Sequence, residues 1–225
     1  LILPLQIWAI PQVGLPKKTE ANVEIDPNKL INTFTTSLPP IPTQVGLNLS
    51  SLVSGNTTVF GEFSAGRGPT RPARAAAVAQ PPQPWQHRAS FGFTTTTAFN
   101  LSMTNEFEFN SSAPDGRQWD AMGLASARNP LRLLATAQSL QDLPVRRALF
   151  TYLSWQDLFI QHLDLTGFVR LDLETHSRAQ WFEVRYHWDR ADVALQWQLY
   201  AGRPGSVYAS VPQQRNVQAV MRFFF

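Results

Sequence analysis

A strict alternation of apolar and polar residues in the C-terminal part of the chain limits what it can fold into. Over residues 163–173 every odd position is apolar or glycine, while the even positions include Asp164, Arg170 and Asp172. Successive side chains of a β-strand point to opposite faces of its sheet, so this period of two predicts a strand with one apolar face. The opposite face carries more charge than the core of a soluble β-sandwich tolerates. The same period recurs over 182–188, 193–201 and 217–225.

The alternation and the turn residues together predict nine strands, with connections of two kinds. On the side of the C-terminus every connection is short, whereas the long connections all fall on the other side. Short turns at one end and long loops at the other are typical of transmembrane β-barrels. The predicted strands cover residues 44–53, 57–64, 86–98, 101–110, 147–156, 162–175, 180–188, 193–201 and 216–225. The short connections are 54–56, 99–100, 157–161 and 189–192, and the long ones are 65–85, 111–146 and 202–215.

Composition excludes several other classes of protein. A hydrophobic fraction of 44% excludes a disordered chain, yet no stretch has the about 18 consecutive apolar residues of a membrane-spanning helix. The absence of cysteine excludes a disulfide scaffold, a zinc ribbon and a thiol nucleophile. The formal charge is +3 and the basic residues are scattered, which argues against a nucleic-acid-binding surface. The first residues lack an initiating Met and a basic segment, so we expect a processed chain or a fragment.

The chain ends in the sequence VQAVMRFFF, with apolar residues at every second position up to a terminal Phe. This ending resembles the C-terminal signature of bacterial outer-membrane β-barrel proteins, the porin-like superfamily of Gram-negative bacteria. The resemblance implies that the barrel-insertion machinery recognises the last strand, and that the barrel contacts outer-membrane lipid and lipopolysaccharide. It names a superfamily and no specific activity. The positions that carry it are Val217, Ala219, Met221, Phe223 and Phe225.

The N-terminal residues 1–43 allow two interpretations, while residues 44–225 are expected to form the barrel. Residues 5–10, 21–25 and 31–38 can supply further strands. Because single-chain bacterial barrels have an even number of strands, we expect an antiparallel up-and-down transmembrane barrel of about 12 strands, or 10 as the fallback. Alternatively, residues 1–30 form a periplasmic extension or a plug inside the barrel.

The polar face of these strands is expected to line the lumen. In the register that we expect for the hairpin around 176–181, Glu174 faces Arg185, Asp172 faces His187 and His176 faces Glu183. Such a ladder either keeps the barrel interior hydrated and closed or sorts small hydrophilic solutes or an anionic polymer. The barrel is therefore a channel or transporter, or else a non-conducting structural barrel that anchors a surface or secretion complex. The expected lumen-lining residues are Asp164, Arg170, Asp172, Glu174, His176, Glu183, Arg185, His187, Gln196, Gln198, Gln218 and Arg222.

Two of the long loops have features of their own. Residues 65–85 carry Arg67, Arg71 and Arg74, which either contact lipopolysaccharide phosphates or are ordinary loop arginines. Residues 111–146 contain a segment of helical spacing between Pro130 and Pro144, which predicts a short helix in the mouth of the barrel or over it. Both loops are candidates for contact with a protein partner.

No enzyme, metal site or cofactor is predicted. The nearest candidate for a nucleophile and its base is the pair His176 and Ser177, but adjacent residues of a strand point to opposite faces. A membrane-embedded hydrolase is therefore the weakest of the alternatives. Asp172, Glu174 and His176 share one face and form either a cation site or, as we favour, a solvated patch of the lumen. The four His residues show no paired metal-ligand spacing.

Overall fold

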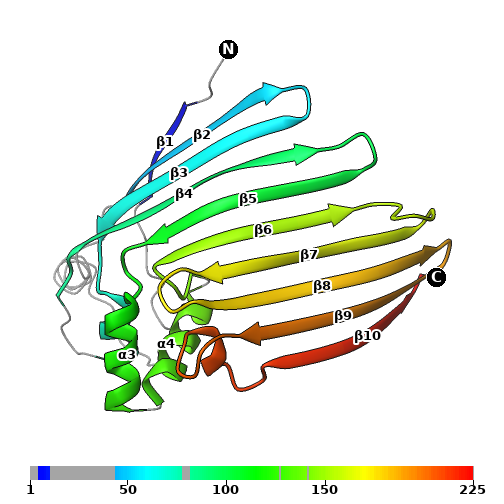
Figure 1. Ribbon diagram of the computed structural model, residues 1–225. Helices are drawn as coiled ribbons and strands as arrows, with labels where there is room; N and C mark the ends of the chain where they lie inside the picture. Colours follow the sequence, from blue (N-terminus) through cyan, green and yellow to red (C-terminus); the bar gives the residue numbers. More distant parts are fainter. Residues whose placement is uncertain (1–4, 11–43, 78–81, 127, 141, 225) are drawn as a thin grey trace, which may run out of the picture.

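The structure is a computed structural model, which describes residues 5–10, 44–77, 82–126, 128–140 and 142–224. In these residues one antiparallel sheet has ten strands, each hydrogen-bonded to the next in chain order (Figure 1). The strands are β1 (Leu5–Ile10), β2 (Gln44–Ser54), β3 (Thr57–Arg67), β4 (Trp85–Thr96), β5 (Leu101–Asn110), β6 (Arg147–Trp155), β7 (Leu163–Asp172), β8 (Ser177–Trp188), β9 (Ala191–Ala201) and β10 (Arg215–Phe223).

The all-β, antiparallel, up-and-down arrangement that the alternation predicts is confirmed. Each of the nine strands predicted from residue 44 onward forms, and the segment 5–10 forms β1, which pairs with β2. The expected strands over 21–25 and 31–38 lie outside the described residues. The sheet is open in the part of the chain described, because its two edge strands, β1 and β10, are not paired with each other. The expected closed barrel is thus not formed by these residues alone.

The two ends of the sheet differ as the sequence predicts. Figure 1 shows hairpin connections at the end where the chain terminates and the helices gathered at the other end. We call these the turn end and the loop end. The loop end carries the helices α2 (Arg71–Ala75), α3 (Gly116–Ala125) and α4 (Arg128–Ser139) and a short 3-10 helix, η1 (Tyr208–Ser210).

Local sequence explains the loop-end helices. The expected helix after Pro130 is α4, which begins two residues earlier and buries Leu133 and Ala137. The sequence analysis missed α3, although Asp115 and Gln118 form a capping box at its start, in which each side chain accepts a hydrogen bond from the other's backbone N–H. No helix of the described segments is long and apolar enough to cross a membrane.

The hydrophobic core lies at the loop end instead of between two layers. Trp119 of α3 and Leu133 of α4 pack with Val145, Val207 and Tyr208 from the loops. Ala148 of β6 and Ala179 of β8 supply the sheet side of this cluster, which we call the plug. The Trp119 Nε1 donates to the carbonyl oxygen of Gly205 at 2.6 Å, so the buried indole has its partner. Burial raises the pKa of the Tyr208 phenol. The plug therefore fixes three loops against one face of the sheet.

Candidate functional site

The sheet has one polar face, and strand pairing brings most of the predicted lumen residues together on it. Asp164 of β7 pairs with Arg185 of β8, and Glu183 of β8 pairs with Gln196 of β9. Because paired residues of neighbouring strands share a face, the polar face can be followed from strand to strand. The predicted residues on it are Asp164, Arg170 and Asp172 in β7, Glu183, Arg185 and His187 in β8, Gln196 and Gln198 in β9, and Gln218 and Arg222 in β10.

The expected register of the β7–β8 hairpin is wrong. Asp172 pairs with Ser177 and not with His187, so the strands meet in a turn over residues 173–176. Glu174 and His176 lie in this turn and not on the strands. The turn is tight because the Asp172 carboxylate accepts the backbone N–H groups of Glu174 and Thr175, at 2.9 and 3.0 Å. The faces were nonetheless assigned correctly, since the error moved the register by an even number of residues.

Near the turn end, the polar face holds a chain of charged side chains that contact one another. Arg185 Nε lies 2.8 Å from Glu183 Oε1, and Arg185 Nη1 lies 3.2 Å from Asp192 Oδ2. The two ring nitrogens of His187 contact Asp192 at 2.9 Å and Asp164 at 3.1 Å. Asp192 was not among the predicted lumen residues, because the predicted strand began at 193 and β9 begins two residues earlier, at Ala191. Each buried carboxylate of this network has a hydrogen-bond partner, as buried charge requires.

Another ion pair crosses strand β6 on the polar face, closer to the loop end. Arg170 Nη2 of β7 lies 2.9 Å from Glu108 Oε1 of β5, across the intervening strand β6. The central carbon of the Arg170 guanidinium lies 4.7 Å from the centre of the Phe150 ring, a cation–π contact. Glu62, Glu106 and Glu108 were also not among the predicted lumen residues. The alternation in residues 106–109, Glu-Phe-Glu-Phe, was the signal that could have identified the latter two.

A hollow of about 490 Å³ lies over the polar face of β2 to β5. Its lining includes three glutamates and Arg88, together with serine and asparagine side chains. Glu62 accepts a hydrogen bond from Asn48 at 3.1 Å, while Glu106 forms no ion pair with a described residue. The hollow is therefore polar and acidic. The acidic residues that line it are Glu62, Glu106, Glu108 and Asp142.

One predicted loop arginine is part of the structure of the loop end. Arg71 of α2 is only 1% exposed, and its Nη2 lies 2.5 Å from the Asp142 carboxylate. Asp142 also accepts from Arg88 and Asn110, each at 2.9 Å, and so links the two long loops to β4 and β5. Burial lowers the pKa of the Arg71 guanidinium, and Asp142 opposes that effect. Arg71 is therefore a buried, ion-paired residue of the loop end and not an exposed loop arginine.

The residues weighed as a catalytic pair serve the β7–β8 turn. Ser177 is buried, and its hydroxyl lies 3.1 Å from Asp172 and accepts the backbone N–H of Tyr208 at 3.2 Å. His176 has a φ of 55°, in the left-handed region that the turn requires. The Asp172 carboxylate is occupied by the turn itself, and Glu174 pairs with Arg147 at 2.6 Å. The described residues contain no group of three side chains suited to a metal ion.

No other described segment covers the opposite, apolar face of the sheet. Val217, Ala219, Met221 and Phe223 of the terminal signature lie on this face, while Phe225 falls outside the described residues. The large side chains exposed on it include Val45, Leu49, Val59, Phe63, Trp85, Phe91, Phe93, Leu149, Leu171, Trp188, Leu195, Val217, Met221 and Phe223. By contrast, the buried side chains of the strands are on the polar face, namely Asn110, Ala148, Asp172, Ser177, Ala179, Glu183, Asp192 and Ala194.

No protein-family model, curated protein or solved structure matches this chain. Any function assigned to the chain therefore rests on the geometry of the two faces of its sheet.

Proposed function

We propose that the chain is an integral β-barrel protein of a bacterial outer membrane, with its apolar face against lipid and its polar face around a lumen. The observation that carries this proposal is that the sheet exposes its apolar face, the reverse of what a soluble protein does. Its exposed face is apolar, with Phe91 61% exposed and Val217 70% exposed, whereas three charged residues of the opposite face, Asp172, Glu183 and Asp192, are buried. Monomeric soluble proteins rarely expose so continuous an apolar surface. Lipid is the surrounding in which this arrangement is stable.

The length of the strands supports the same proposal. From β2 to β10 the strands have 9 to 12 residues, and a tilted transmembrane β-strand needs about 9–11. In lipid every backbone polar group must be paired, so the edges of β1 and β10 must also find partners. The proposal therefore requires closure of the barrel.

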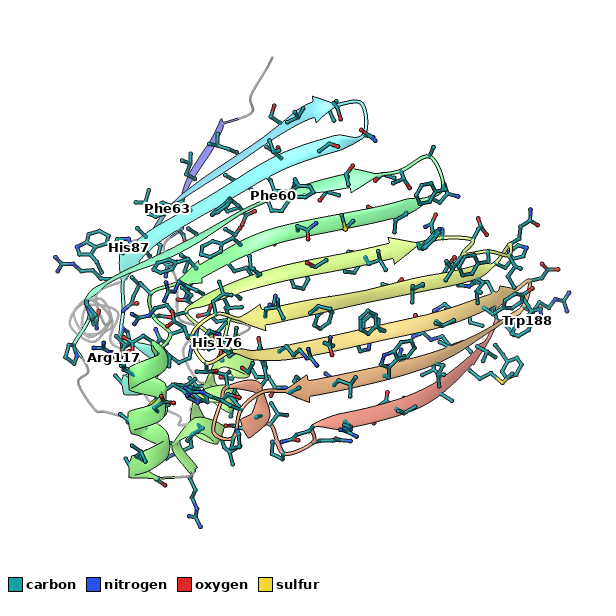
Figure 2. All side chains as sticks on the ribbon, in the orientation of Figure 1. Phe60, Phe63, His87, Arg117, His176 and Trp188 are labelled. Carbon is teal, nitrogen blue, oxygen red and sulfur yellow. The ribbon has the colours of Figure 1, made fainter. Side chains whose placement is uncertain are left out.

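Aromatic residues at the turn end also support it. Phe99 lies 5.8 Å from Trp155 between ring centres, and Trp155 lies 5.8 Å from Phe159. Trp188, which Figure 2 labels near the turn end, packs edge-on against Tyr186 at 4.5 Å. Such exposed rings suit the interface between lipid and water, where barrels carry an aromatic girdle.

Within this barrel, we propose that the lumen passes small hydrophilic solutes. The hollow over β2 to β5 supports this function, because it is polar and offers about 490 Å³ of space. Its glutamates favour small cations and neutral solutes over an anionic polymer, since like charges repel. In planar lipid bilayers the purified full chain is expected to give conductance steps with a preference for cations. The double change Glu62→Gln and Glu106→Gln should reduce that preference, while Asp120→Asn, on exposed α3, should leave it unchanged. A silent bilayer would contradict conduction.

A non-conducting barrel is the second candidate, and the plug favours it. The plug covers the polar face of β6 and β8 at the loop end, where Leu133 is 0% exposed and Ala148 is 0% exposed. In this case the loops 65–85 and 111–146 hold a partner protein. Replacement of residues 116–139 by a Gly-Ser linker distinguishes the two. A non-conducting barrel predicts that the wild type gives no conductance, that the variant conducts, and that the variant loses a co-purifying partner. A conducting channel predicts conductance steps in both the wild type and the variant.

A further inference from the structure

A second hollow, of about 310 Å³, lies at the loop end between the β3–β4 loop and the last turn of α4. Its wall includes Arg67, Arg71, Arg74 and Arg88 but only one acidic residue, Asp142. It shares Ser64, Arg88 and Asp142 with the acidic hollow over β2 to β5, so the two hollows adjoin. A basic entrance therefore precedes an acidic interior.

Two of the four arginines have their charge compensated and two do not. Asp142 pairs with the buried Arg71 at 2.5 Å and with Arg88 at 2.9 Å. Arg67 and Arg74 are exposed, and neither forms an ion pair with any residue of the described chain. Arg74 therefore has a guanidinium group available to a ligand in the hollow, and Arg67 has one at its rim, because Arg67 pairs with Trp85 on the apolar face of the sheet.

The Arg67 and Arg74 guanidinium groups both contact neighbouring residues. The Arg67 guanidinium lies 5.7 Å from the centre of the Trp85 ring, which is exposed on the apolar face of the sheet. Arg74 Nη2 lies beside Gly68, 3.8 Å from the position that a Cβ on this glycine would take, which is ordinary van der Waals contact. Gln86 Nε2 donates to the Gly68 carbonyl oxygen at 3.0 Å and fixes the intervening loop. Arg71, 1% exposed, lines the same hollow and its Nε has no hydrogen-bond partner within the described residues.

We propose that this hollow binds a phosphate group. The planar guanidinium of arginine presents parallel N–H donors that match two phosphate oxygens, which makes Arg74 in the hollow and Arg67 at its rim suitable ligands. The ion pair of Arg71 and Asp142 forms part of the wall, and the side-chain amide of Gln86 adds an uncharged hydrogen-bond donor. The phosphate belongs either to a solute that enters the lumen or to lipopolysaccharide, whose head group would lie beside Arg67 and Trp85.

The test measures binding to the full chain purified in detergent free of lipopolysaccharide. One arm titrates inorganic phosphate by calorimetry, and the other measures flotation with vesicles that contain lipopolysaccharide against vesicles of phosphatidylcholine. The double variant Arg67→Gln and Arg74→Gln is expected to bind about tenfold more weakly or worse, because charge-assisted hydrogen bonds are lost. Arg117→Gln removes an exposed arginine of α3 at the same end, outside the hollow (Figure 2), and is expected to bind as the wild type does.

The two arms identify the source of the phosphate. Saturable binding of inorganic phosphate indicates a solute site, and binding of the lipopolysaccharide vesicles alone indicates a head-group site. No saturable binding in either arm, or equal loss in the double variant and in Arg117→Gln, would overturn the proposal. If the double glutamine variant does not fold, Arg67→Lys with Arg74→Lys replaces it. This variant keeps the charge but loses the planar fork, and wild-type binding by it would also overturn the proposal.

Discussion

The buried ion pair between Arg71 and Asp142 predicts that the change Asp142→Ala detaches the plug from the sheet. The change removes the only carboxylate that contacts Arg71 among the described residues, and Arg71 stays 1% exposed. Its remaining partners are the Leu143 carbonyl oxygen and, at 3.4 Å, the Ser112 hydroxyl. Because α2 and the end of α4 meet at this pair, an uncompensated charge there separates the two long loops.

The expected cost depends on the burial of the two groups. Removal of one partner from a buried pair costs about 3–5 kcal/mol, since it leaves the other charge without compensation in a poorly solvated place. Asp120→Ala is the matched control, because Asp120 pairs with Arg203 at 3.2 Å but both side chains are 53% exposed. An exposed pair contributes about 0–1 kcal/mol. The change Arg71→Met should cost less than Asp142→Ala, because Asp142 keeps Arg88 and Asn110 as partners.

Native-state proteolysis measures this local opening. Trypsin cleavage after the exposed Arg117 or Arg128 requires the plug to open, so its rate reports the free energy of opening. A loss of about 3 kcal/mol should increase the cleavage rate by about two orders of magnitude for Asp142→Ala. Asp120→Ala should change it by less than about fivefold. Equal cleavage rates for the two variants would refute the assignment of Asp142 as the link between the loops.

Two further pairs of substitutions test the packing of the sheet and the surroundings of its apolar face, each by equilibrium urea unfolding of protein in lipid vesicles. A Cβ at Gly92 would overlap the backbone oxygen of Asn105, so Gly92→Ala should lower the free energy of unfolding by about 1–3 kcal/mol. Gly123 lies in α3 with open space around it, so Gly123→Ala should raise the free energy of unfolding by about 0.5–1 kcal/mol. Leu195→Arg on the apolar face should lower the free energy of unfolding in a bilayer by about 2–4 kcal/mol. Leu124→Arg on α3, where Leu124 is 91% exposed, should leave it almost unchanged. Equal effects of the two substitutions would contradict contact of the apolar face with lipid.

The alternation of apolar and polar residues was sufficient to predict the strands, because it can be recognised within each segment without knowledge of its partners. It placed the nine strands from residue 44 onward and assigned Asp164, Arg170 and Glu183 to one face. It did not determine the register of the β7–β8 hairpin, since the turn is fixed by hydrogen bonds from Thr175 and Ser177 to Asp172. Any register that keeps the faces would have satisfied the alternation equally well.

The parts of the candidate site that join distant residues were outside the reach of sequence patterns. Arg170 meets Glu108 over an intervening strand, and this requires knowledge of the register of two pairs of strands at once. Arg71 seemed an exposed loop arginine because its partner, Asp142, lies 71 residues further along the chain. The basic hollow next to it has the same origin, since β3, β4 and the end of α4 each supply part of its wall.

Site-directed fluorescence labelling along β9 tests the central claim most directly, that the apolar face contacts lipid. The chain has no cysteine, so single cysteines at Val193, Leu195, Gln196 and Gln198 can each carry one environment-sensitive dye. After reconstitution into vesicles, dyes at Val193 and Leu195 should emit at shorter wavelength and be quenched by spin-labelled lipid. Dyes at Gln196 and Gln198, on the polar face, should not be quenched. Equal quenching at all four positions, or none at any, would contradict the account.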